Sequence, residues 1–273
     1  EAVVRVPRPL VVDHLLAVHA EAEHLERAAH ARRVAAAAAP PPLHLLLRKR
    51  RLELRLLVLR HVGGQRFALA QRLAVLAEVG RQRRTVRDFS DRPVPREIIE
   101  TAILTAGTAP NGANHQPWHF TVLGQGTLRT QLREAAEAEE RAFYEGKASA
   151  EWLEALEPLG TDASKPFLET APWIIAVFAQ RRGGPKPGDD RKNYYVSESV
   201  GIACGLLIAS LHQAGLATLT HTPNPMGFLT EICERPSTEK PMMLVVCGYP
   251  AEGAQVPLHA LEKKALTQIS DFR

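Results

Sequence analysis

The chain has 273 residues, of which 45% are hydrophobic and 23% charged, with 18 Gly and 20 Pro. This composition is that of a globular protein with a sizeable core, and it excludes a collagen, a fully disordered chain and a disulfide-stapled mini-protein. The net charge is +4, but residues 1–65 hold 11 Lys and Arg against 6 Asp and Glu, which leaves the remainder close to neutral. A nucleic-acid surface needs basic side chains on the folded domain itself, so we predict no nucleic-acid partner.

Three cysteines, Cys204, Cys233 and Cys247, lie in apolar stretches of sequence. An odd number cannot all pair within one chain, so we expect buried thiols and a reducing, cytoplasmic location. No uninterrupted apolar run of about 18 residues occurs, and we therefore predict no membrane span.

Residues 1–65 use a narrow alphabet that lacks Ser, Thr, Asn, Ile, Met, Phe, Tyr, Trp and Cys. We predict a low-complexity basic extension over 1–65 and a second domain over 66–273. Two interpretations of the extension stay open: GC-rich sequence translated ahead of the true start, or a genuine, disordered tail with an Ala/Pro linker at 35–42. A genuine tail would bind acidic surfaces in a salt-sensitive way. Its six histidines lack neighbouring Cys or paired carboxylates, so we predict no metal site.

Hydrophobic periodicity predicts alternating helices and strands after residue 66. In chain order we expect helices over 67–80, 95–106, 127–144 and 193–214, and strands over 118–123, 173–179, 216–220 and 242–248. Residues 147–168 are interrupted by Gly and Pro, which is typical of a mobile cover segment. The tail carries a late hydrophobic stretch (Leu266, Ile269, Phe272) that is suited to docking on another surface.

Short polar clusters carry the candidate chemistry, although each also has an ordinary structural explanation. The run RRTVR at 83–87 groups three guanidinium groups around a hydroxyl, which suits a phosphate but also a solvated basic turn. Glu140 and Tyr144 are four residues apart and share a helix face, as many surface pairs do. Lys165 alone is typical of a solvated lysine, and His221 of a packing or polar-edge histidine.

Common catalytic signatures are missing from the sequence. It contains no Gly-x-Gly-x-x-Gly after a strand, no phosphate-loop motif, no His-Glu-x-x-His, no Cys-x-x-Cys and no Gly-x-Ser-x-Gly. These absences disfavour a dinucleotide-binding fold, a P-loop enzyme, a zinc protease and an α/β-hydrolase.

Four segments, taken in order, form a more specific pattern. They are RRTVRDFSDRPVPREIIETAILTAGTAPNGANHQPWHFTVL, YYVSESVGIACGLLIASLHQAGL, LATLTHTP and EKPMMLVVCGYP. Together they resemble the nitroreductase superfamily of FMN flavoproteins, and more narrowly its iodotyrosine deiodinase branch, over residues 80–270. The resemblance implies an α+β fold with a central mixed sheet flanked by helices, in a domain-swapped homodimer that holds FMN at its interface.

The resemblance also implies the residues that bind the flavin. They are Arg83, Arg84, Thr85, Arg87, Pro110, Asn111, Gly112, Thr220, Thr222 and, where the family usually has a phosphate-binding Arg, Lys263 or Lys264. Thr222 matches the catalytic hydroxyl that hydrogen-bonds the flavin N5, and the flavin itself carries the redox chemistry.

Glu140, Tyr144 and Lys165 match the three positions that clamp the amino-acid part of a halotyrosine in the deiodinases. The backbone N–H of Ala113 matches the donor to the substrate phenolate. A carboxylate, an ammonium and a phenol complement a zwitterion. The resemblance therefore implies reductive dehalogenation of halotyrosine, releasing halide and tyrosine, with electrons from NAD(P)H directly or through a reductase.

Two other functions stay open from the sequence. One is a broad NAD(P)H-dependent nitro or quinone reductase. The other is a flavin-free protein that only binds a tyrosine-like amino acid.

Overall fold

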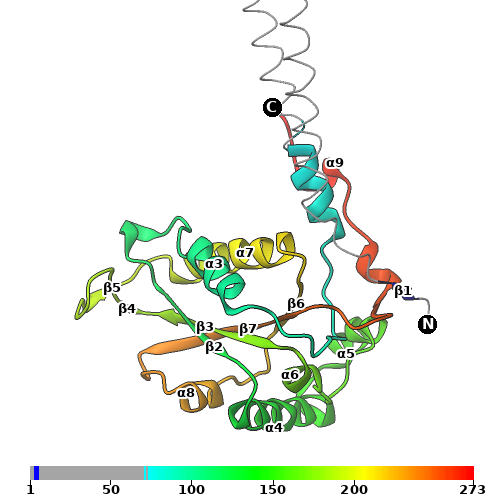
Figure 1. Ribbon diagram of the computed structural model, residues 1–273, viewed down its shortest axis with the longest axis horizontal. Helices are drawn as coiled ribbons and strands as arrows, with labels where there is room; N and C mark the ends of the chain where they lie inside the picture. Colours follow the sequence, from blue (N-terminus) through cyan, green and yellow to red (C-terminus); the bar gives the residue numbers. More distant parts are fainter. Residues whose placement is uncertain (1–2, 6–70, 72) are drawn as a thin grey trace, which may run out of the picture. The chain divides into compact units, whose positions relative to one another are not determined.

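A four-stranded sheet forms the centre of the part of the chain that the computed structural model describes, namely residues 3–5, 71 and 73–273. Across the sheet the order is β2 (Trp118–Leu123), β3 (Trp173–Gln180), β7 (Glu239–Gly248) and β6 (Ala217–His221) (Figure 1). All three pairings are antiparallel. Where the sequence predicted a mixed sheet, the strands of the described residues are therefore antiparallel. A parallel contact occurs as one isolated bridge, between Thr85 and Thr218.

Helices cover both faces of this sheet. On one face lie α3 (Arg96–Ala106) and α7 (Val196–Gln213), and on the other lie α4 (Thr127–Ala142), α6 (Phe167–Thr170) and α8 (Phe228–Ile232) (Figure 1). Because successive strand residues point to opposite faces, β3 contributes Ile174 and Phe178 to the core under α4 and Ile175 and Val177 to the core under α7. A strand buried on both faces explains why this segment is apolar throughout.

The remaining elements are short. They are β1 (Val3–Arg5), η1 (Gly112–Asn114), the π turn η2 (Phe143–Lys147), α5 (Ala150–Leu156), η3 (Glu157–Leu159), β4 (Arg182–Gly183), β5 (Arg191–Lys192), β8 (Gln255–Pro257), η4 (Leu258–Leu261) and α9 (Leu266–Ile269). Most of the predicted cover segment is helical in short pieces. Ser149 caps one of them, α5, by accepting from the backbone N–H of Trp152. None of the described helices is long and apolar enough to span a membrane.

The described N-terminal residues pair within the folded unit. Val3–Arg5 form β1, which runs antiparallel to β8. The chain divides into one unit of Glu1–Arg8 with Arg83–Arg273, and a second unit of Pro9–Gln82. In the second unit residues 73–82 are helical, whereas the start of the predicted 67–80 helix and most of the 1–65 extension fall outside the described residues.

The three cysteines are free and buried, as expected. Burial raises the pKa of Cys204 and of Cys233 to about 11 and that of Cys247 to about 12. Thiols with such pKa values stay protonated at neutral pH, so they are core residues and not nucleophiles.

Candidate functional site

Three side chains that are far apart in the sequence meet at one cavity of about 260 Å³, which we call the clamp cavity. Glu140, Tyr144 and Lys165 all line it. The Nζ atom of Lys165 lies 3.2 Å from Oε2 of Glu140, and 5.8 Å from the centre of the Tyr144 ring. The Lys165 and Glu140 side chains are only 4% and 15% exposed, so this ion pair is shielded from water.

Contacts between the end of α4 and the cover segment bring the three residues together. Glu140 lies in the last turn of α4, and Tyr144 lies in the π turn that continues the helix. The Tyr144 hydroxyl donates to the carbonyl of Thr161 at 3.0 Å, which ties the end of α4 to the cover segment. Lys165 Nζ donates to Thr161 Oγ1 at 3.4 Å and to the carbonyl of Asp162. The buried ammonium is therefore satisfied by three oxygen atoms, as a buried charge must be.

Aromatic side chains form part of the wall of the clamp cavity. Phe143, Trp152 and Phe167 line it, and the rings of Phe143 and Trp152 meet edge to face with centroids 4.8 Å apart. Trp152 belongs to α5 in the cover segment and remains largely exposed. This wall is suited to exclude water from a bound aromatic ring.

The end of β6 forms another part of the wall, where Thr220, His221 and Thr222 line the cavity and the His221 ring meets that of Phe167 edge to face. Burial, followed by the nearby charges of Lys165 and Arg87, lowers the pKa of His221 to about 3. Its Nε2 atom is buried and has no hydrogen-bond partner among the described residues. His221 is therefore neutral at physiological pH and belongs to the cavity wall, a role that its sequence neighbours did not indicate.

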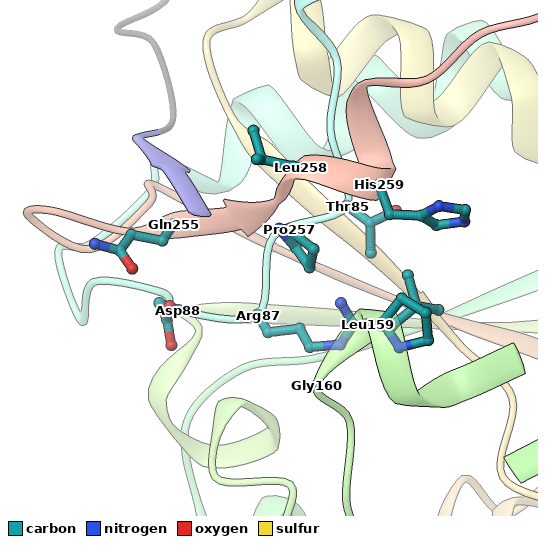
Figure 2. Close-up of a pocket in the computed structure, with 10 residues that line it drawn as sticks. Thr85, Arg87, Asp88, Leu159, Gly160, Gln255, Pro257, Leu258 and His259 are labelled. Carbon is teal, nitrogen blue, oxygen red and sulfur yellow. The ribbon is translucent and has the colours of Figure 1, made fainter. Parts of the chain in front are cut away.

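The arginine-rich segment 83–87 runs along the β6 edge of the sheet. The Val86 N–H donates to the carbonyl of Thr218 at 3.2 Å, and the Val86 side chain is buried. Arg87 lines the clamp cavity and also a neighbouring cavity of about 490 Å³, which we call the flanking cavity. Figure 2 shows Arg87 extending there toward Leu159 of the cover segment, with Thr85 and residues of β8 and η4 around it.

The charges of this segment favour an anion. Burial lowers the pKa of Arg83, and the neighbouring charge of Arg84 lowers it further. Burial also lowers the pKa of Arg87, although Tyr144 and Asp88 act in the opposite direction. No described carboxylate forms an ion pair with Arg83 or Arg87. Partly buried guanidinium groups that form no ion pair with a described carboxylate favour an anionic ligand, so Arg83 and Arg87 fit a phosphorylated flavin such as FMN.

The predicted loop Pro110–Ala113 lies at the other side of the sheet. It leads into β2, whereas Thr220–Thr222 ends β6, and these two strands are opposite edges of the sheet. Three strand spacings, about 14 Å, separate those edges. Within the described residues, Pro110, Asn111, Gly112 and Ala113 line neither cavity.

The loop is nevertheless held in a defined shape. Asn111 Nδ2 donates to the carbonyl of Ala109 at 3.0 Å, and Asn111 Oδ1 accepts from the Gln116 N–H at 2.8 Å. Ala113 has φ 51°, a conformation that is uncommon for a residue with a Cβ. A Cβ on Gly112 would lie 2.9 Å from the Tyr194 carbonyl oxygen, so only glycine fits there without a shift. Backbone strain of this kind concentrates at functional sites.

Lys263 also stands apart from both cavities. Its Nζ atom donates to the carbonyls of Ala260 at 2.6 Å and Glu262 at 2.9 Å, and among the described residues it lines neither cavity. The structure thus gathers Arg87, Thr220, Thr222 and the three clamp residues in one place, with Thr85 beside them. Among the described residues, Arg83, Arg84, the Pro110–Ala113 loop and Lys263 line neither cavity. In the described ranges, no group of three His, Cys, Asp or Glu side chains is placed to hold a metal ion.

Comparison with known proteins assigns the class. The sequence model of the nitroreductase family matches residues 81–249, more than half of the chain. The chain therefore belongs to the nitroreductase family.

Individual relatives narrow the assignment. The chain is 51% identical to an iodotyrosine deiodinase of Haliscomenobacter hydrossis over 210 residues, which cover 76% of this chain and 95% of the relative. It is 43% identical to an iodotyrosine deiodinase of Nematostella vectensis, over 69% of this chain and 71% of that one. Its fold matches a crystal structure of oxidised iodotyrosine deiodinase bound to FMN and 3-iodo-L-tyrosine, with a TM-score of 0.60 and 27% identity, over 72% of this chain and all of that one. These matches confirm the predicted iodotyrosine deiodinase branch.

Proposed function

We propose that this protein is an FMN-dependent reductive dehalogenase of halogenated tyrosine, releasing halide and tyrosine. The observation that carries the proposal is the shielded Lys165–Glu140 ion pair beside Tyr144, in a cavity that Arg87 and Thr222 also line. The 51% identity to an iodotyrosine deiodinase supports the same conclusion.

FMN fits the arginine-rich segment and the end of β6. Arg83, Arg84 and Thr85 would hold its phosphate, and Arg87 would contact the edge of its ring. The Thr222 hydroxyl would donate to the flavin N5. When bound, reduced FMN supplies the two electrons for the reaction. The carbon–halogen bond breaks, the halide leaves, and a proton takes its place on the ring carbon.

The clamp residues recognise the amino-acid part of the substrate. In the structure Glu140 and Lys165 neutralise each other. A zwitterion exchanges this single pair for two, with its carboxylate on Lys165 and its ammonium on Glu140, while the Tyr144 hydroxyl supplies a further hydrogen bond. A ligand with only one of these charges leaves one clamp residue without a partner, which makes the site selective for amino acids.

A homodimer would complete the site. Because the Pro110–Ala113 loop and the Thr222 wall lie at opposite edges of one sheet, the loop of a second copy would supply the flavin contacts and the Ala113 N–H that binds the phenolate. Exposed apolar side chains support this assembly: Leu104 on α3, Ile202 on α7, and Ile269 and Phe272 in the tail. A swapped tail would carry Lys263 to the phosphate of the neighbouring copy.

The electron donor and the cellular location are part of the same proposal. Electrons would reach FMN from NAD(P)H, directly or through a reductase. Three free, buried cysteines fit a reducing compartment, and we infer the cytoplasm.

The test uses FMN-loaded protein that has been reduced with dithionite under anaerobic conditions. Mixed with 3-iodotyrosine, it should release iodide and reoxidise the flavin, and Glu140→Gln should abolish this while still reducing a nitroaromatic compound. Glu134→Gln, at an exposed glutamate of the same helix that lines neither cavity, is the matched control. Wild-type protein that reduces nitroaromatics but neither binds 3-iodotyrosine nor releases iodide is a general nitroreductase, and the proposal fails.

A further inference from the structure

Lys165 is contacted at both of its ends by the same helix. Its ammonium meets the carboxylate of Glu140, and its backbone N–H donates to Oε1 of Glu137 at 2.8 Å. Glu137 precedes Glu140 by three residues, so the two carboxylates lie on one face of α4, about one turn apart. Glu137 does not line the clamp cavity as the described residues define it.

The Glu137 carboxylate is itself held in place. Its Oε2 atom accepts from Nη1 of Arg133 at 2.8 Å, and Nε of Arg133 lies 3.1 Å from Oε1 of Glu169. The Glu137 side chain is only 12% exposed. Nη1 of Arg141 also lies 4.0 Å from Oε2 of Glu137. These two guanidinium groups and the low exposure hold the carboxylate in the orientation that receives the Lys165 N–H.

The chain that follows Lys165 is fixed to α4 as well. The guanidinium of Arg129 is fully buried and donates to the carbonyls of Leu168 at 2.6 Å and Ala171 at 2.8 Å. The cover segment before Lys165, in contrast, has largely exposed elements such as α5. Lys165 therefore lies at the junction between an anchored segment and an exposed one, and Glu137 holds the main chain at that junction.

We propose that Glu137 is a positioning residue for Lys165, an inference that rests on the proposed function. Its carboxylate fixes the Lys165 main chain so that the flexible lysine side chain emerges toward Glu140 and toward the carboxylate of a bound zwitterion. A lysine side chain loses many rotamers when it binds, and a main chain fixed in advance lowers that cost. Glu137 thereby sets the affinity for the carboxylate without touching the substrate.

The experiment compares two substrates that differ only in the group that Lys165 binds. Iodide release is measured with the FMN-loaded full chain on 3-iodotyrosine and on 3-iodotyramine, which lacks the carboxylate. Glu137→Ala should lower kcat/KM for 3-iodotyrosine about tenfold or more, mainly through KM, because a hydrogen bond to a charged group is lost. It should leave kcat/KM for 3-iodotyramine and the affinity for FMN unchanged. Glu134→Gln, at an exposed glutamate of the same helix, should match the wild type for both substrates.

Two further variants keep the test decisive if Glu137→Ala does not retain FMN. Glu137→Gln keeps an oxygen that can accept from the Lys165 N–H, so its kcat/KM for 3-iodotyrosine should stay within about threefold of the wild type. Glu137→Asp keeps the charge but is too short to reach, so it should show the selective loss. Equal losses on both substrates, or no loss on either, overturn this inference alone. Wild-type protein that releases no iodide from 3-iodotyrosine overturns the proposed function instead.

Discussion

The clamp cavity and the Pro110–Ala113 loop differ in one respect: one chain supplies all three clamp residues, whereas the loop lines no cavity of its own chain among the described residues. Glu140, Tyr144 and Lys165 come from the end of α4, the π turn after it and the cover segment, so contacts within one copy complete the clamp. The loop has a defined and strained shape but no described cavity beside it. We therefore propose that one chain binds the amino-acid part of the substrate, whereas the flavin and the substrate phenolate are bound by two.

The largest effect is expected from breaking the clamp pair, which tests whether one chain completes the clamp. Lys165→Met leaves the Glu140 carboxylate buried without its ammonium partner. We expect the free energy of unfolding to fall by about 3 kcal/mol and the affinity for 3-iodotyrosine to fall about 100-fold or more. Urea denaturation and substrate titration of the flavin absorbance measure the two losses.

Two controls separate charge from packing in that experiment. Lys147→Met removes an exposed lysine that pairs with Glu139, and it should cost less than about 1 kcal/mol. The double variant Lys165→Met with Glu140→Gln removes both charges and should regain part of the lost stability. If Lys165→Met is as stable as the wild type, the pair does not contribute to the fold.

The second largest effect is expected from acid, which should lower the free energy of unfolding because His221 is buried beside the clamp as a neutral imidazole. Its pKa is about 3 in the folded chain, below the value of about 6.5 in an unfolded chain, so the unfolded chain takes up the proton first. Stability contributed by the neutral form is complete above pH 6.5 and is lost as the pH falls toward 3. The slope is about 1.4 kcal/mol per pH unit, or about 2 kcal/mol at pH 5.

His221→Phe isolates this contribution in the apoprotein. The difference in unfolding free energy between variant and wild type at pH 7 reports packing alone, and only its change between pH 7 and pH 5 reports the proton. We expect that difference to shift in favour of the variant by about 2 kcal/mol at pH 5. A smaller acid dependence remains in the variant, because burial also lowers the pKa of His119. A difference that stays constant with pH contradicts a buried neutral His221.

Periodicity and spacing predicted some elements and part of the clamp. The strand 118–123 has the predicted limits, and Glu140 with Tyr144 could be placed on one face by their spacing, although the helix ends at Ala142 and Tyr144 sits in a π turn. That Lys165 joins them came from the resemblance, since no periodicity relates a lysine in an irregular segment to a helix 25 residues earlier.

Other parts of the site left no signal in the sequence. His221 in a threonine-rich strand looks like packing until the cavity beside it is known. The Glu137 contact joins a carboxylate to a backbone N–H, and a backbone group has no sequence pattern. Short elements such as α8 and the β4–β5 pair depend on tertiary contacts more than on local propensity, so periodicity did not predict them.

The smallest effect, and the one that decides the comparison, is expected from a charge placed on α7. Ile202 on α7 and Leu128 on α4 are both 45% exposed, but they lie on helices that cover opposite faces of the sheet. If α7 lies at the interface of the dimer, Ile202→Glu buries a charge there. It should then give a monomer and lower the affinity for FMN about tenfold, because the flavin loses the loop of the second copy. Leu128→Glu should leave both unchanged.

Sedimentation at a fixed protein concentration measures the oligomeric state, and flavin fluorescence measures the affinity for FMN. A third measurement, the loss of stability caused by Lys165→Met, reports on the clamp. Since one chain completes the clamp, monomeric Ile202→Glu should keep the wild-type stability difference between Lys165→Met and its parent. Loss of FMN together with an intact clamp locates the dependence on a second copy in the flavin half of the site. A monomer that binds FMN as tightly as the wild type would mean that one chain holds the flavin alone, and the strained loop at Ala113 would then need another explanation.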